Sequence, residues 1–170
     1  MKLLIFSDVH GQKERLIEIL DKHQDADYKI SLGDSELRRK FLQKNDIIAV
    51  KGNYPLDAGV GYEQTINIKG LKWLLVHGHK NKVKSGYETL YYKILETEAD
   101  VALHGHTHIL HFDEVSGKYI INPGAINHAR GNYDESYLIA TINEFSVDLE
   151  WKSAYTHENI REESFTFKPR

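Results

Sequence analysis

Residues 103–110, LHGHTHIL, place three histidines at positions 104, 106 and 108, with a glycine and a threonine between them. Further histidines, acids and an asparagine lie beside glycines in four other segments: Asp8-Val9-His10-Gly11, Gly33-Asp34, Gly52-Asn53 and His77-Gly78-His79. Imidazole nitrogens combined with carboxylate and amide oxygens suit Mn, Fe, Zn, Co, Ni or Mg. If folding brings the five segments together, these residue types predict a metal site.

The number of donors favours two ions over one. Seven side chains are candidate ligands, namely Asp8, His10, Asp34, Asn53, His77, His106 and His108. Seven donors are too many for one ion that must keep a reactive water, whereas two ions sharing one carboxylate would each receive about four. Two divalent ions lower the pKa of a bridging water toward ~7 and clamp both oxygens of an in-line phosphoryl displacement. The predicted chemistry is hydrolysis of a phosphate ester by hydroxide.

The spacing inside two of the segments also favours convergence. Asp8 and His10 follow a predicted strand, and side chains in extended backbone repeat every two residues, so we expect both to point the same way. The same argument applies to His106 and His108. Glycines beside the ligands permit tight turns or a close approach of backbone to metal or phosphate. His104 precedes the glycine of its segment, and we expect it in the core or a pocket wall.

Apolar runs and helical spacing predict the elements that carry these segments. We expect strands over 2–7, 28–32, 46–50, 62–68, 71–77, 101–103, 109–115, 118–121, 136–143 and 145–151, and helices over 12–23, 36–43 and 85–97. The early alternation of strands and helices indicates a parallel sheet, so the fold class is α/β with later antiparallel strands. Carboxyl ends of parallel strands converge on one crevice, and each ligand segment follows a strand. We predict one domain over 1–170, with 158–170 a loosely held tail.

Composition excludes several kinds of site and partner. The chain has 170 residues, no cysteine and a formal net charge of −3. Without cysteine there is no thiol nucleophile, disulfide or thiolate metal site. No block of five or more basic residues occurs, so we do not expect a nucleic-acid partner. No apolar run is long enough for a membrane span or a signal peptide, so we expect a cytoplasmic protein without membrane contact.

In their order along the chain, the five segments resemble the motifs of the calcineurin-like metallophosphoesterases, especially the small single-domain bacterial and archaeal phosphodiesterase branch. The resemblance runs from residue 1 to about residue 125 and reaches Asn122-Pro123-Gly124, which is similar to the Asn-Pro-Gly-Ser stretch of that branch. It implies a four-layer αββα sandwich of two mixed sheets flanked by helices. It also implies a phosphodiesterase in which a metal-bridging hydroxide attacks a small phosphate ester.

The same resemblance implies a role for each ligand. One ion would be held by Asp8, His10 and His108, the other by Asn53, His77 and His106, and Asp34 would bridge them. Asn53 would also contact the substrate phosphate. We expect two divalent ions, manganese first, and leave nickel, zinc, iron, cobalt and magnesium open because the donor set suits all of them.

The sequence departs from the family pattern after Gly52-Asn53. Many members carry a histidine and an acid there, or a cysteine and an aspartate in the small branch, whereas Tyr54-Pro55 follows here and the next acid is Asp57. Without the usual proton donor, activated esters are favoured over phosphomonoesters. His79 is a candidate to donate to a substrate oxygen or act as the acid, and Arg130 to bind a phosphate oxygen. A structural role for His79 and a solvated loop for Arg130 stay open.

Two other functions are kept as alternatives. The first is a non-catalytic, metal-binding scaffold of the same fold for protein interactions, similar to a subunit of the eukaryotic retromer. Such relatives tend to lose ligand histidines, whereas all seven positions are filled here. The second is a nuclease, against which the acidic balance counts. Exposed strand edges in a small sandwich also make a homo-oligomer plausible.

Overall fold

A computed structural model describes residues 1–169 of the chain and consists of strands with three helices between them. The elements are β1 (Lys2–Phe6), α1 (Lys13–Lys22), β2 (Tyr28–Ser31), α2 (Arg39–Lys44), β3 (Ile47–Ala49), β4 (Glu63–Ile68), β5 (Leu71–Val76), α3 (Glu88–Glu96), β6 (Val101–Leu103), β7 (His111–Val115), β8 (Lys118–Asn122), β9 (Ser136–Ile142), β10 (Ser146–Ser153) and β11 (Asn159–Thr166). They form a six-stranded sheet, β11-β10-β9-β1-β2-β3, and a five-stranded sheet, β4-β5-β6-β8-β7.

Each sheet combines parallel and antiparallel pairs, as predicted. The strands β1, β2 and β3 run parallel, and β9 joins β1 antiparallel. In the other sheet β5, β6 and β8 run parallel, while β4 and β7 pair antiparallel at the two edges. The hairpin between β4 and β5 turns at Lys69 and Gly70, which both have positive φ. Such a two-residue turn matches the twist of the flanking strands.

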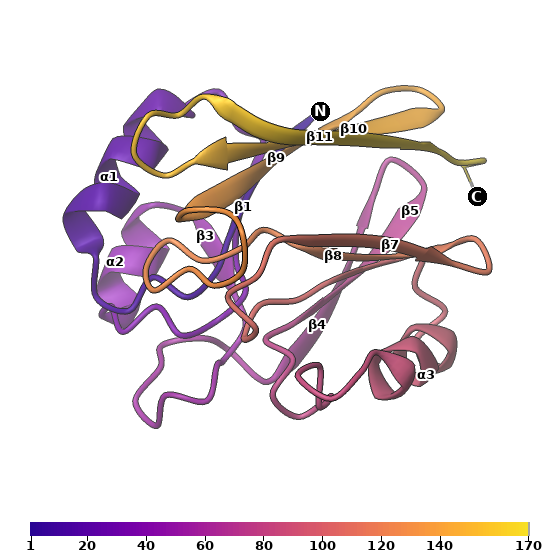
Figure 1. The fold of residues 1–170 in the computed structure, drawn as a ribbon, viewed down its shortest axis with the longest axis horizontal. Coiled ribbons are helices and arrows are strands. Elements are labelled where there is room, and N and C mark those ends of the chain that lie inside the picture. Colours follow the sequence, from indigo (N-terminus) through magenta and orange to yellow (C-terminus); the bar gives the residue numbers. More distant parts are fainter. Residues whose placement is uncertain (170) are drawn as a thin grey trace.

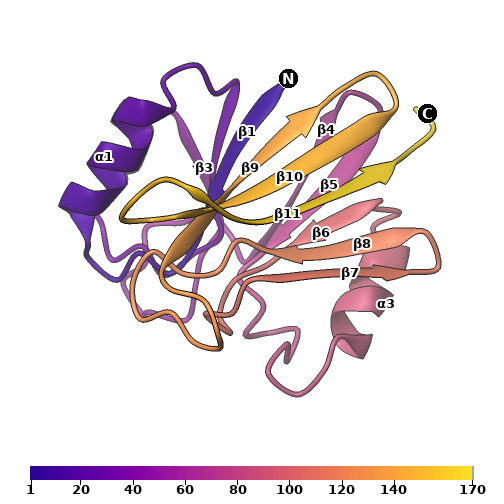
Figure 2. The ribbon, with the colours of Figure 1, turned by 45° about the horizontal axis from the view of Figure 1, so that its top comes forward.

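The sheets stack face to face, with helices on both outer sides. Figure 1 shows α1 and α2 on one side of the stack and α3 on the other, and Figure 2 shows the same layers from a tilted view. Side-chain alternation along β1 explains the order of layers, because Leu3 and Ile5 enter the core between the sheets while Leu4 and Phe6 pack toward α1. A third cluster, with Leu90 and Ile94, lies between α3 and the second sheet. The predicted αββα sandwich is confirmed.

Two segments differ from the expected elements. Residues 159–166 were expected to be loosely held, but they form β11, which pairs with β10 along its length. Phe165 is buried there and stacks on Tyr119 at 3.8 Å between ring centroids, so the segment covers one end of the core. Residue 170 lies outside the described residues. The second helix begins at Arg39 instead of residue 36, because Glu36 has a φ of +55° and cannot belong to a right-handed helix.

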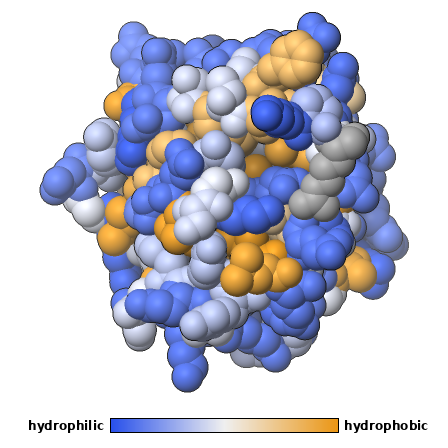
Figure 3. Space-filling view, turned by 90° about the vertical axis from the view of Figure 1, so that its right-hand side faces the viewer, coloured by the Kyte–Doolittle hydropathy of each residue, from blue (hydrophilic) through white to orange (hydrophobic). Residues whose placement is uncertain are grey.

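The surface on the side of α3 is mixed in character. Figure 3 shows hydrophobic residues on this face as patches interrupted by hydrophilic ones. On α3, Tyr92 and Leu95 are exposed, so the helix packs on the sheet through its opposite side. Over residues 1–169, none of the helices combines the length and the apolar character needed to cross a membrane.

A buried hydrogen-bonded chain lies behind the first sheet, away from the ligand segments. His23, at the end of α1, has its Nε2 at 2.9 Å from the Tyr137 hydroxyl, which in turn lies 3.1 Å from His157 Nδ1. His23 is only 8% exposed. Burial, helped by the nearby charge of Lys2, lowers the pKa of His23 to about 4. The imidazole is therefore neutral at neutral pH in the folded chain.

This buried imidazole predicts a pH-dependent stability. An unfolded histidine takes up its proton near pH 6.5, whereas His23 in the folded chain does so near pH 4, so stability is lost as the pH falls between these values. We expect the free energy of unfolding to drop by about 2 kcal/mol from His23 alone on going from neutral pH to about pH 5. Urea unfolding of the native chain and the His23→Gln variant at both pH values measures this difference. Equal pH dependence in the two proteins would contradict it.

Candidate metal centre

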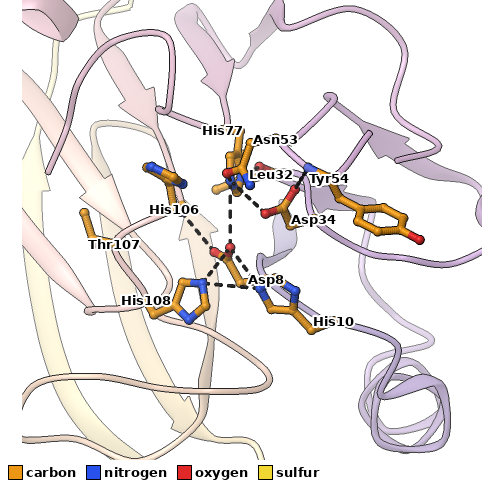
Figure 4. Close-up of polar contacts among 12 residues, drawn as sticks. Asp8, His10, Leu32, Asp34, Asn53, Tyr54, His77, His106, Thr107 and His108 are labelled. Atoms are coloured by element: carbon orange, nitrogen blue, oxygen red, sulfur yellow. Dashed lines mark hydrogen bonds and ion pairs between the residues drawn. The ribbon is translucent and has the colours of Figure 1, made fainter. Parts of the chain in front are cut away.

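The seven predicted ligands come together where the parallel strands of both sheets end. Asp8 and His10 follow β1, Asp34 follows β2, Asn53 follows β3, His77 follows β5, and His106 and His108 follow β6. Figure 4 shows these side chains facing a common centre, with Asp8 in the middle. Segments separated by up to about a hundred residues thus meet at one site, as the strand-end argument predicts.

Two overlapping groups of these residues could each hold a metal ion. Asp8, His10 and His108 form one group, and Asp8, Asp34 and His77 form the other; within each, one ligand atom per residue lies within 4.8 Å of the others. Asn53 extends the second group, because its Oδ1 is 3.2 Å from His77 Nε2. His106 is the remaining neighbour, with its ring centroid 5.0 Å from that of His77. Asp8 belongs to both groups. The family resemblance instead implies that Asp34 is the ligand shared by the two ions.

The Asp8 carboxylate provides the test of whether a cation fits here. Its Oδ2 accepts a hydrogen bond from the His106 backbone N–H at 3.0 Å. Its Oδ1 is fully buried and accepts no hydrogen bond from the described part of the chain. The Nε2 atoms of three imidazoles nevertheless lie near this oxygen: His108 at 3.2 Å, His10 at 3.7 Å and His77 at 3.9 Å. A buried anionic oxygen surrounded by imidazole nitrogens suits a divalent cation between them.

The same three imidazoles are oriented by their other ring nitrogen. The Nδ1 atoms contact Leu32 O at 2.8 Å in His77, His128 O at 2.7 Å in His108 and Glu36 Oε1 at 2.8 Å in His10. A carbonyl or carboxylate acceptor selects the tautomer with the proton on Nδ1. Each Nε2 then presents a lone pair to the common centre. Glu36 and the carbonyls of Leu32 and His128 were not identified from the sequence, because nothing in its spacing marks them.

The backbone of the ligand loops differs from the extended form assumed for Asp8-x-His10 and His106-x-His108. The φ angles are +53° at Asp8, +44° at His10, +68° at His106 and +61° at His108, and Asp34 has +51°. The strands end at Phe6 and Leu103, so these ligands lie in loops. Their side chains converge because of left-handed turns, and the two-residue repeat was the wrong reason. Non-glycine residues seldom adopt this region, and such strain is typical of functional sites.

Two glycines make room for the carboxylates. A Cβ atom on Gly52 would lie 1.9 Å from Asp34 Oδ1, and one on Gly105 would lie 2.7 Å from Asp8 Oδ2 and 1.9 Å from Ser7 Oγ. Any side chain at either position would displace a candidate ligand. The glycines next to Asn53 and His106 are thus explained by the close approach of backbone to carboxylate.

The ligands influence the proton affinity of one another. Burial opposes ionisation of Asp34, but the His77 imidazole and the Tyr54 N–H, which donates to Asp34 Oδ1 at 2.8 Å, lower its pKa to about 2. Burial alone would lower the pKa of His77, yet Asp34 and Asp8 raise it above its ordinary value. His106 differs, because burial and the charge of His77 lower its pKa to about 4. The centre therefore combines ionised carboxylates with imidazoles, one of which is held neutral.

The remaining predicted residues lie around this centre. The ring centroid of His79 is 5.4 Å from that of His77 and 6.0 Å from that of His106, and His79 Nδ1 has no hydrogen-bond partner among residues 1–169. Arg130 is exposed, and its backbone N–H donates to His108 O at 2.9 Å. In Figure 4 the Tyr54 ring points away from Asp8, so only its backbone serves the centre. His104 is fully buried and outside the ligand set, as predicted.

A buried carboxylate that sequence reasoning passed over ties two of the ligand loops together. Asp57 accepts hydrogen bonds from the backbone N–H groups of Asp34 (2.8 Å), Gly52 (2.7 Å), Ser35 and Ala58 (both 3.1 Å), and from the Ser35 hydroxyl (3.1 Å). It thereby joins the loop after β2 to the loop after β3. The absence of an acid directly after Asn53 was noticed from the sequence, but the anchoring role of Asp57 was not.

Several known proteins are similar to this chain. Residues 1–144 match the model of the calcineurin-like phosphoesterase superfamily domain. A probable metallophosphoesterase of Bacillus subtilis is 36% identical over 143 residues, covering 84% of this chain and 85% of that protein. A probable metallophosphoesterase of Mycoplasma pneumoniae is 33% identical over 129 residues, covering 74% of this chain and 79% of that protein.

Solved structures show the same fold. The crystal structure of a predicted phosphoesterase from Streptococcus pneumoniae superposes with a TM-score of 0.88 at 26% identity and covers 97% of both chains. A single mutant of Vps29 from Entamoeba histolytica superposes with a TM-score of 0.78 at 23% identity, covering 99% of this chain and 100% of its own. At that identity the likeness to Vps29 concerns the fold alone.

The Asp57 anchor predicts that a residue outside the ligand set controls metal affinity. Asp57→Asn removes the negative charge that accepts five hydrogen bonds, so the loops of Asp34 and Asn53 should lose their fixed separation. We expect Mn²⁺ to bind at least about ten-fold more weakly, measured by isothermal titration calorimetry, and the fold to persist by circular dichroism. Asp21→Asn, an exposed change on α1, is the control. Native Mn²⁺ affinity in Asp57→Asn would exclude the role.

Proposed function

Because this chain belongs to the calcineurin-like phosphoesterase superfamily, we propose that it is a two-metal phosphodiesterase acting on a small phosphate ester. The observation that carries the proposal is the buried Asp8 Oδ1, which faces three imidazole Nε2 atoms and accepts no hydrogen bond from residues 1–169. When bound, two divalent ions would supply an activated water and offset the charge of the phosphate. This also lets a chain with a net charge of −3 accept an anion.

The proposed ligand sets follow the two sides of Asp8. Asp8, His10 and His108 would hold one ion, and Asn53, His77 and His106 the other. Asp34 is proposed as the bridge, because Tyr54 N–H fixes its Oδ1 while its Oδ2 lies 3.4 Å from His77 Nε2. Asp8 lies in both groups and could be shared as well. Manganese is our first expectation for the metal, with nickel, zinc, iron, cobalt and magnesium as alternatives.

Three polar side chains are proposed to act on the substrate. The Asn53 amide, next to His77, would both bind metal and contact a phosphate oxygen. Burial and the charge of His77 lower the pKa of His79, so this imidazole is mainly neutral at neutral pH. A neutral imidazole can donate a hydrogen bond to a substrate oxygen, but it is a poor acid for protonating the leaving group. Arg130 is proposed as a further contact for an anionic group of the substrate. Because no strong acid stands ready to protonate the leaving group, we expect the site to favour diesters with good leaving groups.

The scaffold alternative is less well supported by the site. A scaffold has no need for buried ligands in left-handed backbone, and five of the seven predicted ligands form the two candidate metal groups. The likeness to Vps29 bears on the fold and therefore does not decide between the two functions. A cytoplasmic location and a homo-oligomer remain our predictions, and neither nucleic acid nor membrane is proposed as a partner.

Asp34→Asn tests the proposed reaction. The substitution keeps the side-chain shape but removes the charge shared between the two ligand sets, so metal should bind more weakly and hydrolysis should fall. We expect kcat/KM for bis-p-nitrophenyl phosphate with Mn²⁺ to fall by at least about a hundred-fold. Asp27→Asn, near the amino end of β2, serves as the control. Undiminished turnover in Asp34→Asn, or in native protein treated with a chelator, would refute the proposed function.

His79→Gln tests whether His79 donates a hydrogen bond or a proton. If it only donates a hydrogen bond, the glutamine amide can partly replace it, so the loss in kcat/KM should be at most about ten-fold and nearly the same for aryl methyl phosphates across a range of leaving-group pKa. If it is the acid, the loss should grow steadily as the leaving group becomes poorer. His157→Gln, on the far side of the first sheet, controls for the loss of an imidazole.

A further inference from the structure

A pocket of about 270 Å³ opens directly beside the metal centre. Six residues line it: Val83, Lys84, Tyr87, Thr107, Ile109 and Arg130. Thr107 stands between the ligands His106 and His108, and Figure 4 shows it on the side of these histidines, away from Asp34 and Tyr54. The pocket therefore lies next to the loop that carries His106 and His108.

The pocket wall is held by the loops that hold the ligands. The Thr107 hydroxyl accepts a hydrogen bond from Asn122 Nδ2 at 3.0 Å. The backbone N–H of Arg130 donates to the carbonyl of His108 at 2.9 Å. The position of the pocket relative to the centre is thus set by direct hydrogen bonds, which a site for part of the substrate requires.

The pocket has a positive rim. Lys84 and Arg130 contribute two cations, and the six lining residues include no acid. A pocket on the other side of the centre, next to Tyr54, contains Arg38 and Arg39 but also Glu36. Of these two pockets, the one that contains Lys84 and Arg130 combines two cations with no lining carboxylate.

The inner wall of the pocket is apolar and rigid. Val83 is buried, Ile109 is exposed, and the Tyr87 ring stacks on His111 at 4.7 Å between centroids. The fully buried His104 lies 5.3 Å from the Tyr87 ring on another side. His104, the first histidine of LHGHTHIL, thus helps to fix a pocket wall. A preformed aromatic and aliphatic wall suits a flat or apolar group.

We propose that this pocket binds the ester arm that remains on the phosphate after hydrolysis, and that this arm is an aromatic or apolar group ending in an anion. Tyr87, Val83 and Ile109 contact the body of the arm, and Lys84 and Arg130 bind its anionic end. The assignment rests on the proposed phosphodiesterase function and names the class of substrate.

Two product analogues that differ by one carboxylate test this assignment. Phenyl phosphate and 4-carboxyphenyl phosphate are titrated by calorimetry into Mn²⁺-saturated protein. We expect 4-carboxyphenyl phosphate to bind about five-fold more tightly to the native chain, because two partly solvated ion pairs are gained. In Lys84→Ala and in Arg130→Ala the preference should fall below about two-fold. Lys22→Ala, an exposed lysine on α1, should keep the full preference.

The two analogues separate failure of the pocket from failure of the function. If phenyl phosphate binds but the carboxylate adds nothing, or if the preference survives in Lys84→Ala and Arg130→Ala, the pocket assignment is overturned and the hydrolase proposal stands. If phenyl phosphate does not bind and bis-p-nitrophenyl phosphate is not hydrolysed, both proposals fail together.

Discussion

A buried carboxylate at the junction of the two sheets sets the arrangement of this end of the molecule. Asp8 is fully buried, and an ionised carboxylate in such a place is costly unless cations or hydrogen bonds compensate it. The backbone N–H of His106 donates a hydrogen bond to Oδ2, whereas Oδ1 has only the imidazoles of His10, His77 and His108 near it. Burial would raise the pKa of Asp8, but His108 and His77 hold it below its ordinary value, so the carboxylate stays charged and available to a metal.

The strained loops that present the ligands are stabilised by one another. Asp8 N–H donates to Gly33 O and His10 N–H to Asp34 O, both at 3.1 Å, while Gly105 N–H donates to His77 O at 3.0 Å. Each bond joins a loop at one strand end to the loop at a neighbouring strand end. The left-handed φ angles at the ligands are tolerated because this network over-determines the backbone. The packed sheets therefore act as a rigid support, and apolar burial in the three clusters offsets the free-energy cost of the strained loops.

The sequence predicted the strands and the convergence of the ligands because both depend on local patterns, whereas the four layers were implied by the family resemblance. Apolar runs identify strands such as β1, and the carboxyl ends of parallel strands lie at the same edge of a sheet regardless of the conformation of the loops that follow. What it missed depends on tertiary contacts. Glu36 looks like part of a helix until its contact with His10 is seen, and β11 looks polar because Phe165 is the one residue of this strand that is buried. Loop conformation was also out of reach, so convergence was predicted for the wrong geometric reason.

The loop after β3 shows which part of the family pattern this chain retains. Tyr54 stands where a proton donor is usual, and the acid comes three residues later. Between them the chain makes a turn, which a hydrogen bond from Asp57 N–H to Tyr54 O closes at 3.0 Å. This turn places the Asp57 carboxylate where it accepts hydrogen bonds from the N–H groups of Asp34 and Gly52. This loop thus places an acid that fixes two metal-ligand loops, while Tyr54 occupies the position where the family pattern has a proton donor. The loop is one basis of our proposal that the site acts on leaving groups that depart without protonation.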